Sequence, residues 1–426
     1  MIRPKIKPAW LLSLCALAVF ACTLARGAES APLTLATAIA EAQDKNPEIR
    51  ALAANVDAAR GAVMAAKTWD NPELAVAPGI RKTQPTGGPS TSEFHGVFEL
   101  KQTVEFPGKR SLRRALAEKD VELRKLALAA FRDQLAIQVR RSFYALLTSQ
   151  QMLTLKEQGV TLSQTFVDAA RKRVESGFAS EFEATKAEVE MVTSQKALQD
   201  AQAQVAAARA ALNTLLGRKP DGGIEIMGTL TPVMIVPAET NLLLLVVRHN
   251  PSLRIQATEV ERTGLNLRSV RKSRLPDFTV GPSVEYLKDE QTYDFGITLP
   301  LPLLDSKKGE IVTASAEQDG ALAEFEKLQQ EILRDVTTAY HNLVSARESL
   351  ALFTPEFLAK LKSALDDAGQ GYAGGRTTLL IYLETQRTYF DAQADYFDTL
   401  QKLYDAQAAL ETAAGMPLSE LQEKMK

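Results

Sequence analysis

The stretch Asn71-Pro72-Glu73-Leu74 returns 204 positions later as Leu275-Pro276-Asp277-Phe278. Farther along, Val174-x-x-Gly177 returns as Tyr372-x-x-Gly375, 198 positions on. This repetition indicates an internally duplicated chain, and each copy reads in the order helix, strand, turn, strand, very long helix, turn, helix. The predicted organisation is an export signal at 1–28, a first repeat at 29–216, a connector at 217–238, a second repeat at 239–417 and a tail at 418–426.

Each copy predicts two β-strands from residues that alternate between apolar and polar. The first pair flanks a loop rich in Gly, Pro, Ser and Thr at residues 83–92. The clearest strand lies in the second copy, where the alternating apolar residues are Tyr293, Phe295, Ile297, Leu299 and Leu301. Pro78 and Pro282 fall inside two predicted strands. Because proline is poorly tolerated within a sheet, the strand limits around them stay open.

Two very long helices are predicted from apolar residues that recur every seven positions, the pattern of a coiled-coil seam. The seam residues are Val139, Leu146, Leu153, Val160, Val167 and Val174 in the first, and Val336, Leu343, Leu350, Phe357 and Ala364 in the second. The first helix spans about residues 109–174, on the order of 100 Å at 1.5 Å per residue. Pro355 should kink the second. Shorter helices expected at 34–68 and 181–216 together match the long one, which indicates layers of two short helices beside one long helix.

The first 28 residues have the pattern of an export signal. Three basic residues within the first seven positions precede an apolar run at 9–21, which is too short to span a bilayer as a helix. Cleavage after Gly27 and lipidation of Cys22 are two alternative ways to process this segment. Both cysteines lie in it, so the mature chain is expected to contain no disulfide and no thiolate site.

The composition argues against catalysis, cofactor binding and nucleic-acid binding. Removing the four basic residues of the export segment from the 50 in the chain leaves 46 basic against 52 acidic residues. Such an acidic chain is not expected to bind nucleic acid. His95, His249 and His341 are the only histidines and lack metal-ligand spacing, and no phosphate loop or nucleophile elbow occurs. We therefore expect no enzyme activity, no cofactor and no metal site.

The strand lengths indicate a membrane barrel shared between chains. Strands of about nine to eleven residues can cross a bilayer at a tilt. Four strands cannot close, and an open sheet edge in lipid leaves backbone groups without hydrogen bonds. The predicted fold is therefore mainly α with a small β part, in which three chains build a 12-helix α-barrel and a 12-stranded outer-membrane β-barrel. A soluble periplasmic coiled-coil scaffold is the alternative, but it leaves the apolar strand stripes unexplained.

The chain resembles the TolC-type outer-membrane efflux proteins over essentially all of its mature length. The resemblance is carried by the duplicated unit, by Asn71-Pro72-Glu73-Leu74, by residues 102–110 and by the turns at 174–180 and 372–380. The stretch Phe106-Pro107-Gly108-Lys109-Arg110 is most similar to the CzcC-like heavy-metal branch. The resemblance implies a homotrimer in outer-membrane lipid that docks on a periplasmic membrane-fusion adaptor and an inner-membrane RND pump. The barrel–helix junction prolines would be Pro72, Pro107, Pro276 and Pro302, although ordinary helix stops explain them equally.

The resemblance also implies roles for the two turns at the periplasmic tips. The adaptor-contact residues would be Ser176, Gly177, Phe178, Gly374 and Gly375. Glu183 and Tyr372 occupy the positions of a hydrogen-bonded gate pair, and Glu384 that of a second acid at the entrance. A further family acid falls on Ile381, and the family's arginine lies one residue earlier here, at Arg376, so the network is only partly kept. Each acid could equally be a surface charge.

The expected function is that of a passive exit duct. The resemblance implies the outer-membrane channel of a tripartite RND-type efflux system that exports heavy-metal cations, with energy supplied by the inner-membrane partner. A multidrug or type I secretion duct is the alternative within the family. The two repeats differ at the tip, where Tyr372 replaces Val174 and Arg376 replaces Phe178. In the expected trimer, these differences would reduce the symmetry of the ring of six tips from sixfold to threefold, at the place where a gate is needed.

Overall fold

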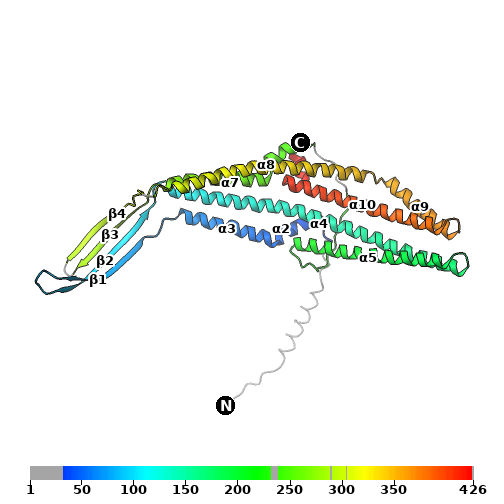
Figure 1. Ribbon diagram of the computed structural model, residues 1–426, viewed down its shortest axis with the longest axis horizontal. Helices are drawn as coiled ribbons and strands as arrows, with labels where there is room; N and C mark the ends of the chain where they lie inside the picture. Colours follow the sequence, from blue (N-terminus) through cyan, green and yellow to red (C-terminus); the bar gives the residue numbers. More distant parts are fainter. Residues whose placement is uncertain (1–31, 232–237, 288–289, 304, 425–426) are drawn as a thin grey trace, which may run out of the picture.

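The computed structural model describes residues 32–231, 238–287, 290–303 and 305–424. These residues form one long, narrow body with a β-sheet at one end and two helical turns at the other (Figure 1). The C-terminal segment lies near the middle of that length (Figure 1). The predictions for the export segment, including the alternatives at Cys22 and Gly27, concern residues outside the described ranges.

Helices make up most of the described chain and follow the order expected from the sequence. The first copy consists of α2 (Leu35–Lys45), α3 (Pro47–Lys67), β1 (Glu73–Thr83), β2 (Thr91–Val104), α4 (Lys109–Glu175) and α5 (Glu181–Leu215). The second consists of α6 (Glu239–His249), α7 (Pro251–Ser273), β3 (Phe278–Leu287), β4 (Glu290–Thr298), α8 (Lys308–Ala351), α9 (Pro355–Ala373) and α10 (Leu379–Ala414). A short helix, α11 (Leu418–Lys424), follows.

The four strands form one antiparallel sheet in the order β1-β2-β3-β4. The register pairs Val76 with Phe98, Phe98 with Val284, and Val284 with Tyr293. Because successive strand residues point to opposite faces, this register gathers the apolar residues on one face. That apolar stripe comprises Leu74, Val76, Ile80, Phe94, Phe98, Leu100, Val284, Tyr293, Phe295 and Ile297. The opposite face carries charged residues such as Glu99, so the sheet is amphipathic.

Both prolines lie inside continuous strands. Pro78 belongs to β1, an edge strand of the sheet, where a missing N–H is tolerated. Pro282 pairs with Phe295 of β4, whereas the pairing of β3 with β2 skips Pro282 and its neighbour Gly281. A Cβ on Gly281 would lie 1.7 Å from the carbonyl oxygen of Leu100, so only glycine allows the two strands to approach there.

The prediction that the fourth strand reaches Leu301 is wrong, because β4 ends at Thr298. Leu299 and Leu301 lie beyond it, each followed by a proline. Proline has no N–H with which to continue the hydrogen-bond ladder, so the alternation of apolar residues outlasts the strand.

The longest helix is confirmed, since α4 runs without interruption for 67 residues. The single opening helix predicted at 34–68 is wrong, because α2 and α3 are separated at Asn46. Pro47 excludes the helical conformation from the residue before it. Asn46 accordingly adopts φ −62° and ψ 124°, and its side chain accepts a hydrogen bond from the Glu48 amide at 2.9 Å. The break is therefore a capped start of a new helix.

Pro355 interrupts the second long helix instead of kinking it. Helix α8 ends at Ala351, and α9 starts at Pro355 after Thr354, whose hydroxyl accepts a hydrogen bond from the Phe357 amide at 3.2 Å. The interruption moves the seam: Phe357 is 44% exposed, Ala364 is exposed and Leu365 is buried in its place. The predicted heptad residues on α8, which are Val336, Leu343 and Leu350, are all buried.

The short helices meet end to end beside the long ones, which confirms the layered arrangement. Helices α3 and α5 both pack on α4, and the Asn46 side-chain amide donates to the Leu215 carbonyl where they meet, at 3.2 Å. In the second copy α7 and α10 pack on α4 and α8. There Asn250 donates to the carbonyls of Ala413 and Ala414, each at 3.1 Å.

A buried ion pair joins helices near the same level. The Glu411 side chain of α10 is 1% exposed, and Arg140 Nη1 of α4 donates to both of its carboxylate oxygens at 2.6 Å. The Leu418 amide at the start of α11 donates to the same carboxylate at 2.9 Å. Because a buried carboxylate without partners would be very unfavourable, these contacts fix the relative positions of the three helices.

Candidate functional site

The turns between α4 and α5 and between α9 and α10 lie together at the end of the molecule opposite the sheet (Figure 1). Each turn contains a glycine in the left-handed region, with φ 73° at Gly177 and φ 72° at Gly375. In the first turn the Phe178 amide donates to the Arg173 carbonyl at 2.8 Å, which closes the helix end, and the second turn closes in the same way at 2.7 Å. The two tips therefore have the same backbone conformation and differ in their side chains.

Tyr372 reaches from the second repeat to the first. It lies on α9 three residues before the tip glycine, and its hydroxyl donates to Glu183 Oε2 of α5 at 3.4 Å. The side chain is buried, with 3% exposed. Burial, reinforced by the Glu183 charge, raises the pKa of Tyr372, so the hydroxyl keeps its proton and remains a donor. The structure thus brings into contact the two residues that the family resemblance paired.

Aromatic rings from two other helices hold Tyr372 in place. The Phe166 ring of α4 lies 5.1 Å from the Tyr372 ring and 4.7 Å from the Tyr382 ring of α10, measured between centroids. Burial raises the pKa of Tyr382 to about 12. Aromatic pairs of this kind contribute about 0.5–1.5 kcal/mol beyond their buried area. The position of the Tyr372 hydroxyl is therefore set by helix packing and not by a loop.

Arg173 is part of this site, although it was not among the residues predicted from the sequence. Its Nη1 donates to the Tyr372 carbonyl at 2.8 Å, and its guanidinium carbon lies 4.8 Å from the centroid of the Tyr372 ring. Its Nε is buried and has no hydrogen-bond partner among the described residues. The counterpart of Arg173 in the second repeat is Gly371, 198 positions on. That difference between the copies is the sequence signal that could have identified it.

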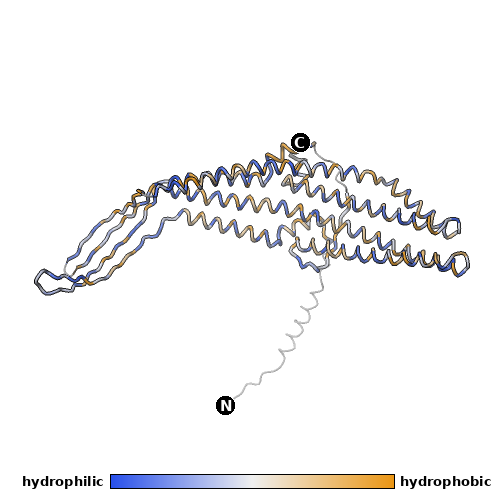
Figure 2. Tube along the Cα trace, viewed as in Figure 1, coloured by the Kyte–Doolittle hydropathy of each residue, from blue (hydrophilic) through white to orange (hydrophobic). Residues whose placement is uncertain are grey.

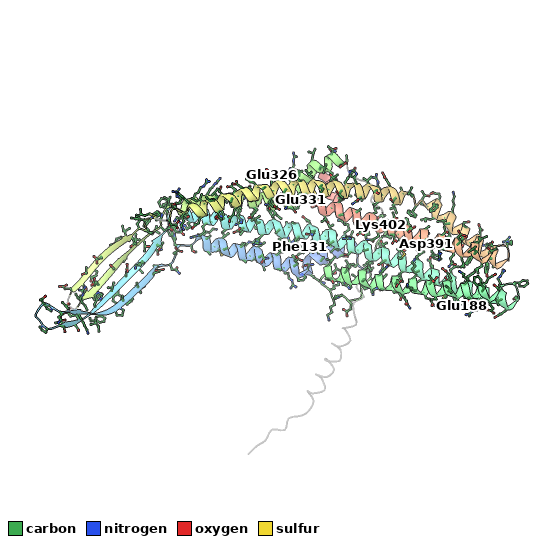
Figure 3. All side chains as sticks on the ribbon, in the orientation of Figure 1. Phe131, Glu188, Glu326, Glu331, Asp391 and Lys402 are labelled. Carbon is green, nitrogen blue, oxygen red and sulfur yellow. The ribbon has the colours of Figure 1, made fainter. Side chains whose placement is uncertain are left out.

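The other predicted tip residues do not join the Tyr372–Glu183 pair. Arg376 and Glu384 are exposed, and neither forms an ion pair within the described part of the chain. The Ser176 hydroxyl donates to the Lys172 carbonyl at 2.8 Å, which places it at the helix end. Phe178 is 78% exposed at the outermost turn. Gly374 and Gly375 likewise lie exposed at the second turn. Figure 3 locates this end of the molecule by Glu188 of α5.

The four predicted junction prolines all lie between the sheet and the helices. Pro72 and Pro276 precede β1 and β3, Pro107 lies between β2 and α4, and Pro302 lies between β4 and α8. Asp277 braces this junction, because it accepts a hydrogen bond from the Phe106 amide at 2.7 Å and pairs with Lys109 Nζ at 2.9 Å. The start of α4 is thereby tied to the start of β3.

The described residues contain no group of three or more His, Cys, Asp or Glu side chains placed to hold a metal ion. In the same ranges no helix combines the length and the apolar character that crossing a membrane requires. Figure 2 agrees, since polar residues recur along the long helices.

Known proteins share both the sequence pattern and this architecture. Residues 38–218 and 242–416 each match the family described as outer membrane efflux protein. The chain is 28% identical over 386 residues, 90% of each chain, to the cobalt-zinc-cadmium resistance protein CzcC of Cupriavidus metallidurans. The fold is similar to a crystal structure of CusC, with a TM-score of 0.74, 18% identity and coverage of 90% of this chain and 92% of that one. It is also similar to VceC of Vibrio cholerae, with a TM-score of 0.72, 16% identity and coverage of 90% and 96%. The chain therefore belongs to the outer membrane efflux protein family, and it is an outer-membrane efflux channel whose long helices lie in the periplasm.

Proposed function

We propose that three copies of this chain form the exit duct of a tripartite efflux system for heavy-metal cations. The observation that carries the proposal is the open four-stranded sheet. β1 and β4 are its edges, each paired on one side only, and one face carries the apolar stripe. Backbone groups at such edges need partners in lipid, and β4 of one copy beside β1 of the next supplies them. Three copies close a barrel of twelve strands.

The helices support the same closure. In the half of the helical body nearer the sheet, the helices pack side by side in the order α3, α4, α7, α8, so α3 and α8 are the free edges. In the half nearer the two turns, α5 packs on α4 and forms the corresponding edge. That helix exposes apolar side chains at Phe182 (67%), Val189 (59%) and Val192 (64%). A neighbouring copy of the chain would cover them and extend the barrel into a helical tunnel.

The proposed cargo follows from the curated relative. CzcC, by its name, confers resistance to cobalt, zinc and cadmium, and the present chain matches it over 90% of its length. A wide aqueous duct needs no tight ligands, so the substrate would be selected by an inner-membrane RND pump and delivered through a periplasmic membrane-fusion adaptor. The exposed turns, with Phe178 at the first tip, are the proposed adaptor contact.

The Glu183–Tyr372 hydrogen bond is the proposed latch of the closed entrance. It joins α5 to α9 across the two repeats, so separating the tips must break it. Glu384 and Arg376 stay exposed and free to face the entrance of the trimer. A ring of carboxylates there would favour cations.

Deletion and complementation test the proposed cargo. A strain lacking the gene should become sensitive to cobalt, zinc or cadmium and should be rescued by the intact chain. Unchanged metal tolerance together with new sensitivity to hydrophobic drugs would favour the multidrug alternative. Fractionation without detergent tests the assembly: recovery of the chain as a soluble periplasmic monomer would refute the duct and favour the scaffold reading.

A further inference from the structure

A hollow of about 650 Å³ lies where the sheet meets the helices. Its wall includes Lys67, Trp69, Val104, Phe106, Arg110 and Arg114. These residues come from the end of α3 and the segment after it, from the end of β2, from the turn between β2 and α4, and from the start of α4. The hollow is distinct from the tips, which lie at the other end of the molecule.

The hollow opens on the apolar face of the sheet. Val104 of β2 is paired with Phe278 of β3, and both line the hollow. Val104 is six residues after Phe98 in the same strand, so the two side chains point to the same face. The hollow therefore continues the apolar stripe at the level where the strands end. In an outer-membrane barrel with this face outward, that level is the periplasmic surface of the lipid.

The wall of the hollow carries three basic side chains, Lys67, Arg110 and Arg114, and one acidic one. Lys67 is exposed and Arg110 half-buried, and neither forms an ion pair with any residue in the described ranges. Arg114 also lines the wall, although it pairs with Glu118 at 2.7 Å. The one acid in the wall, Glu105, pairs with Arg113 through Oε1, while its Oε2 is buried without a hydrogen-bond partner among the described residues. Two uncompensated cations thus face the hollow.

An aromatic platform adjoins these cations. The Arg110 guanidinium carbon lies 3.9 Å from the centroid of the Trp69 ring, and Trp69 is itself 53% exposed. Tryptophan is favoured at membrane interfaces because one part of its ring system is apolar and its N–H is polar. Stacking fixes the planar guanidinium while leaving its N–H donors free for an anion with several oxygens.

We propose that this hollow binds the phosphodiester headgroup of an anionic phospholipid from the periplasmic leaflet. Lys67 and Arg110 would contact the phosphate, and the acyl chains would continue along the apolar stripe. Inorganic phosphate would use the cations but leave Val104 and Phe278 uncovered, which favours the lipid as the source of the anion. The inference rests on the proposed function, because the apolar face meets lipid only in the closed barrel.

The test is lipid retention by the purified assembly. The full chain is reconstituted in nanodiscs with equal phosphatidylglycerol and phosphatidylethanolamine, and lipids that remain bound are counted by native mass spectrometry. Each cation near an anionic lipid surface contributes about fivefold to binding. The double variant Lys67→Gln/Arg110→Gln should therefore lose phosphatidylglycerol by roughly 25-fold. The matched control is Arg124→Gln/Lys125→Gln, two exposed cations about 20 Å farther along α4, which should change nothing.

The remaining outcomes separate this inference from the proposed function. If wild-type chain inserts as a trimer but retains both lipids equally, or if the double variant behaves as the control, the headgroup site is refuted and the duct stands. Displacement of phosphatidylglycerol by millimolar inorganic phosphate would also refute a lipid site. If the wild-type chain does not insert as a trimer, both proposals fail. Should the double variant not assemble, Lys67→Gln alone, at the exposed end of α3, should lose about fivefold.

Discussion

Removal of the Tyr372 hydroxyl should shift the duct toward its open state. The hydrogen bond to Glu183 is 3.4 Å long, so we place it below the usual range for bonds to charged groups, at about 1 kcal/mol. Three such latches that must open together give about 3 kcal/mol, a change of roughly 100-fold in the ratio of closed to open channels. If the three tips open independently, the ratio of closed to open states at each tip would change by only about fivefold.

Single-channel recording in planar bilayers measures this change. Tyr372→Phe and the double variant Tyr372→Phe/Glu183→Ala should raise the open probability to similar extents, because each breaks the same bond. Tyr382→Phe is the matched control, since Tyr382 stacks on the same rings without contacting Glu183. Glu183→Ala alone completes the cycle. Two single-variant effects that simply add in the double variant, or a double variant with wild-type open probability, would refute the latch.

Three further outcomes are expected, each measured as a thermal or denaturant transition by circular dichroism. Burial raises the pKa of Tyr382 from 10 to about 12, so the stabilisation that depends on its protonated hydroxyl is complete below pH 10 and is lost between pH 10 and 12, by at most about 2–3 kcal/mol. Tyr382→Phe should abolish this decrease of the unfolding free energy with pH, and an unchanged decrease would contradict the prediction. Glu411→Ala should lower the free energy of unfolding by about 3–5 kcal/mol, whereas Glu188→Ala, in an exposed pair, should have no measurable effect; equal effects would argue against burial as the cause. Gly177→Ala should destabilise the first tip by about 1 kcal/mol because its φ is 73°, while Gly61→Ala inside α3 should stabilise; the same sign for both would refute the backbone argument.

The spacing of apolar residues predicted most of the helices and strands, because that spacing repeats with the period of the secondary structure that buries them. The helix expected from just after Phe106-Pro107-Gly108 to about Val174 is α4, which was predicted within about one residue of its observed ends. The same reasoning failed at Pro47 and Pro355. There the heptads and apolar spacing continue through a proline, but the missing N–H and the restricted preceding residue start a new, capped helix.

The candidate site was predicted in part. The pairing of Glu183 with Tyr372 came from a family resemblance, whereas Arg173 was not identified at all. Nothing in the residues around Arg173 indicates that its side chain will meet the carbonyl of a residue 199 positions away. The comparison of the two repeats could have singled it out, since the equivalent position is Gly371.

The sequence by itself determined the duplication, the length of α4 and the amphipathic strands, because each depends on residues close together in the chain. Only the tertiary structure decided that Tyr372 packs against Phe166 beside Arg173, and that Lys67 and Arg110 share one hollow with the apolar face of the sheet. Those contacts join residues from separate helices and strands. Their geometry follows from how the helices pack and how the strands pair, and neither is recorded in any single segment of sequence.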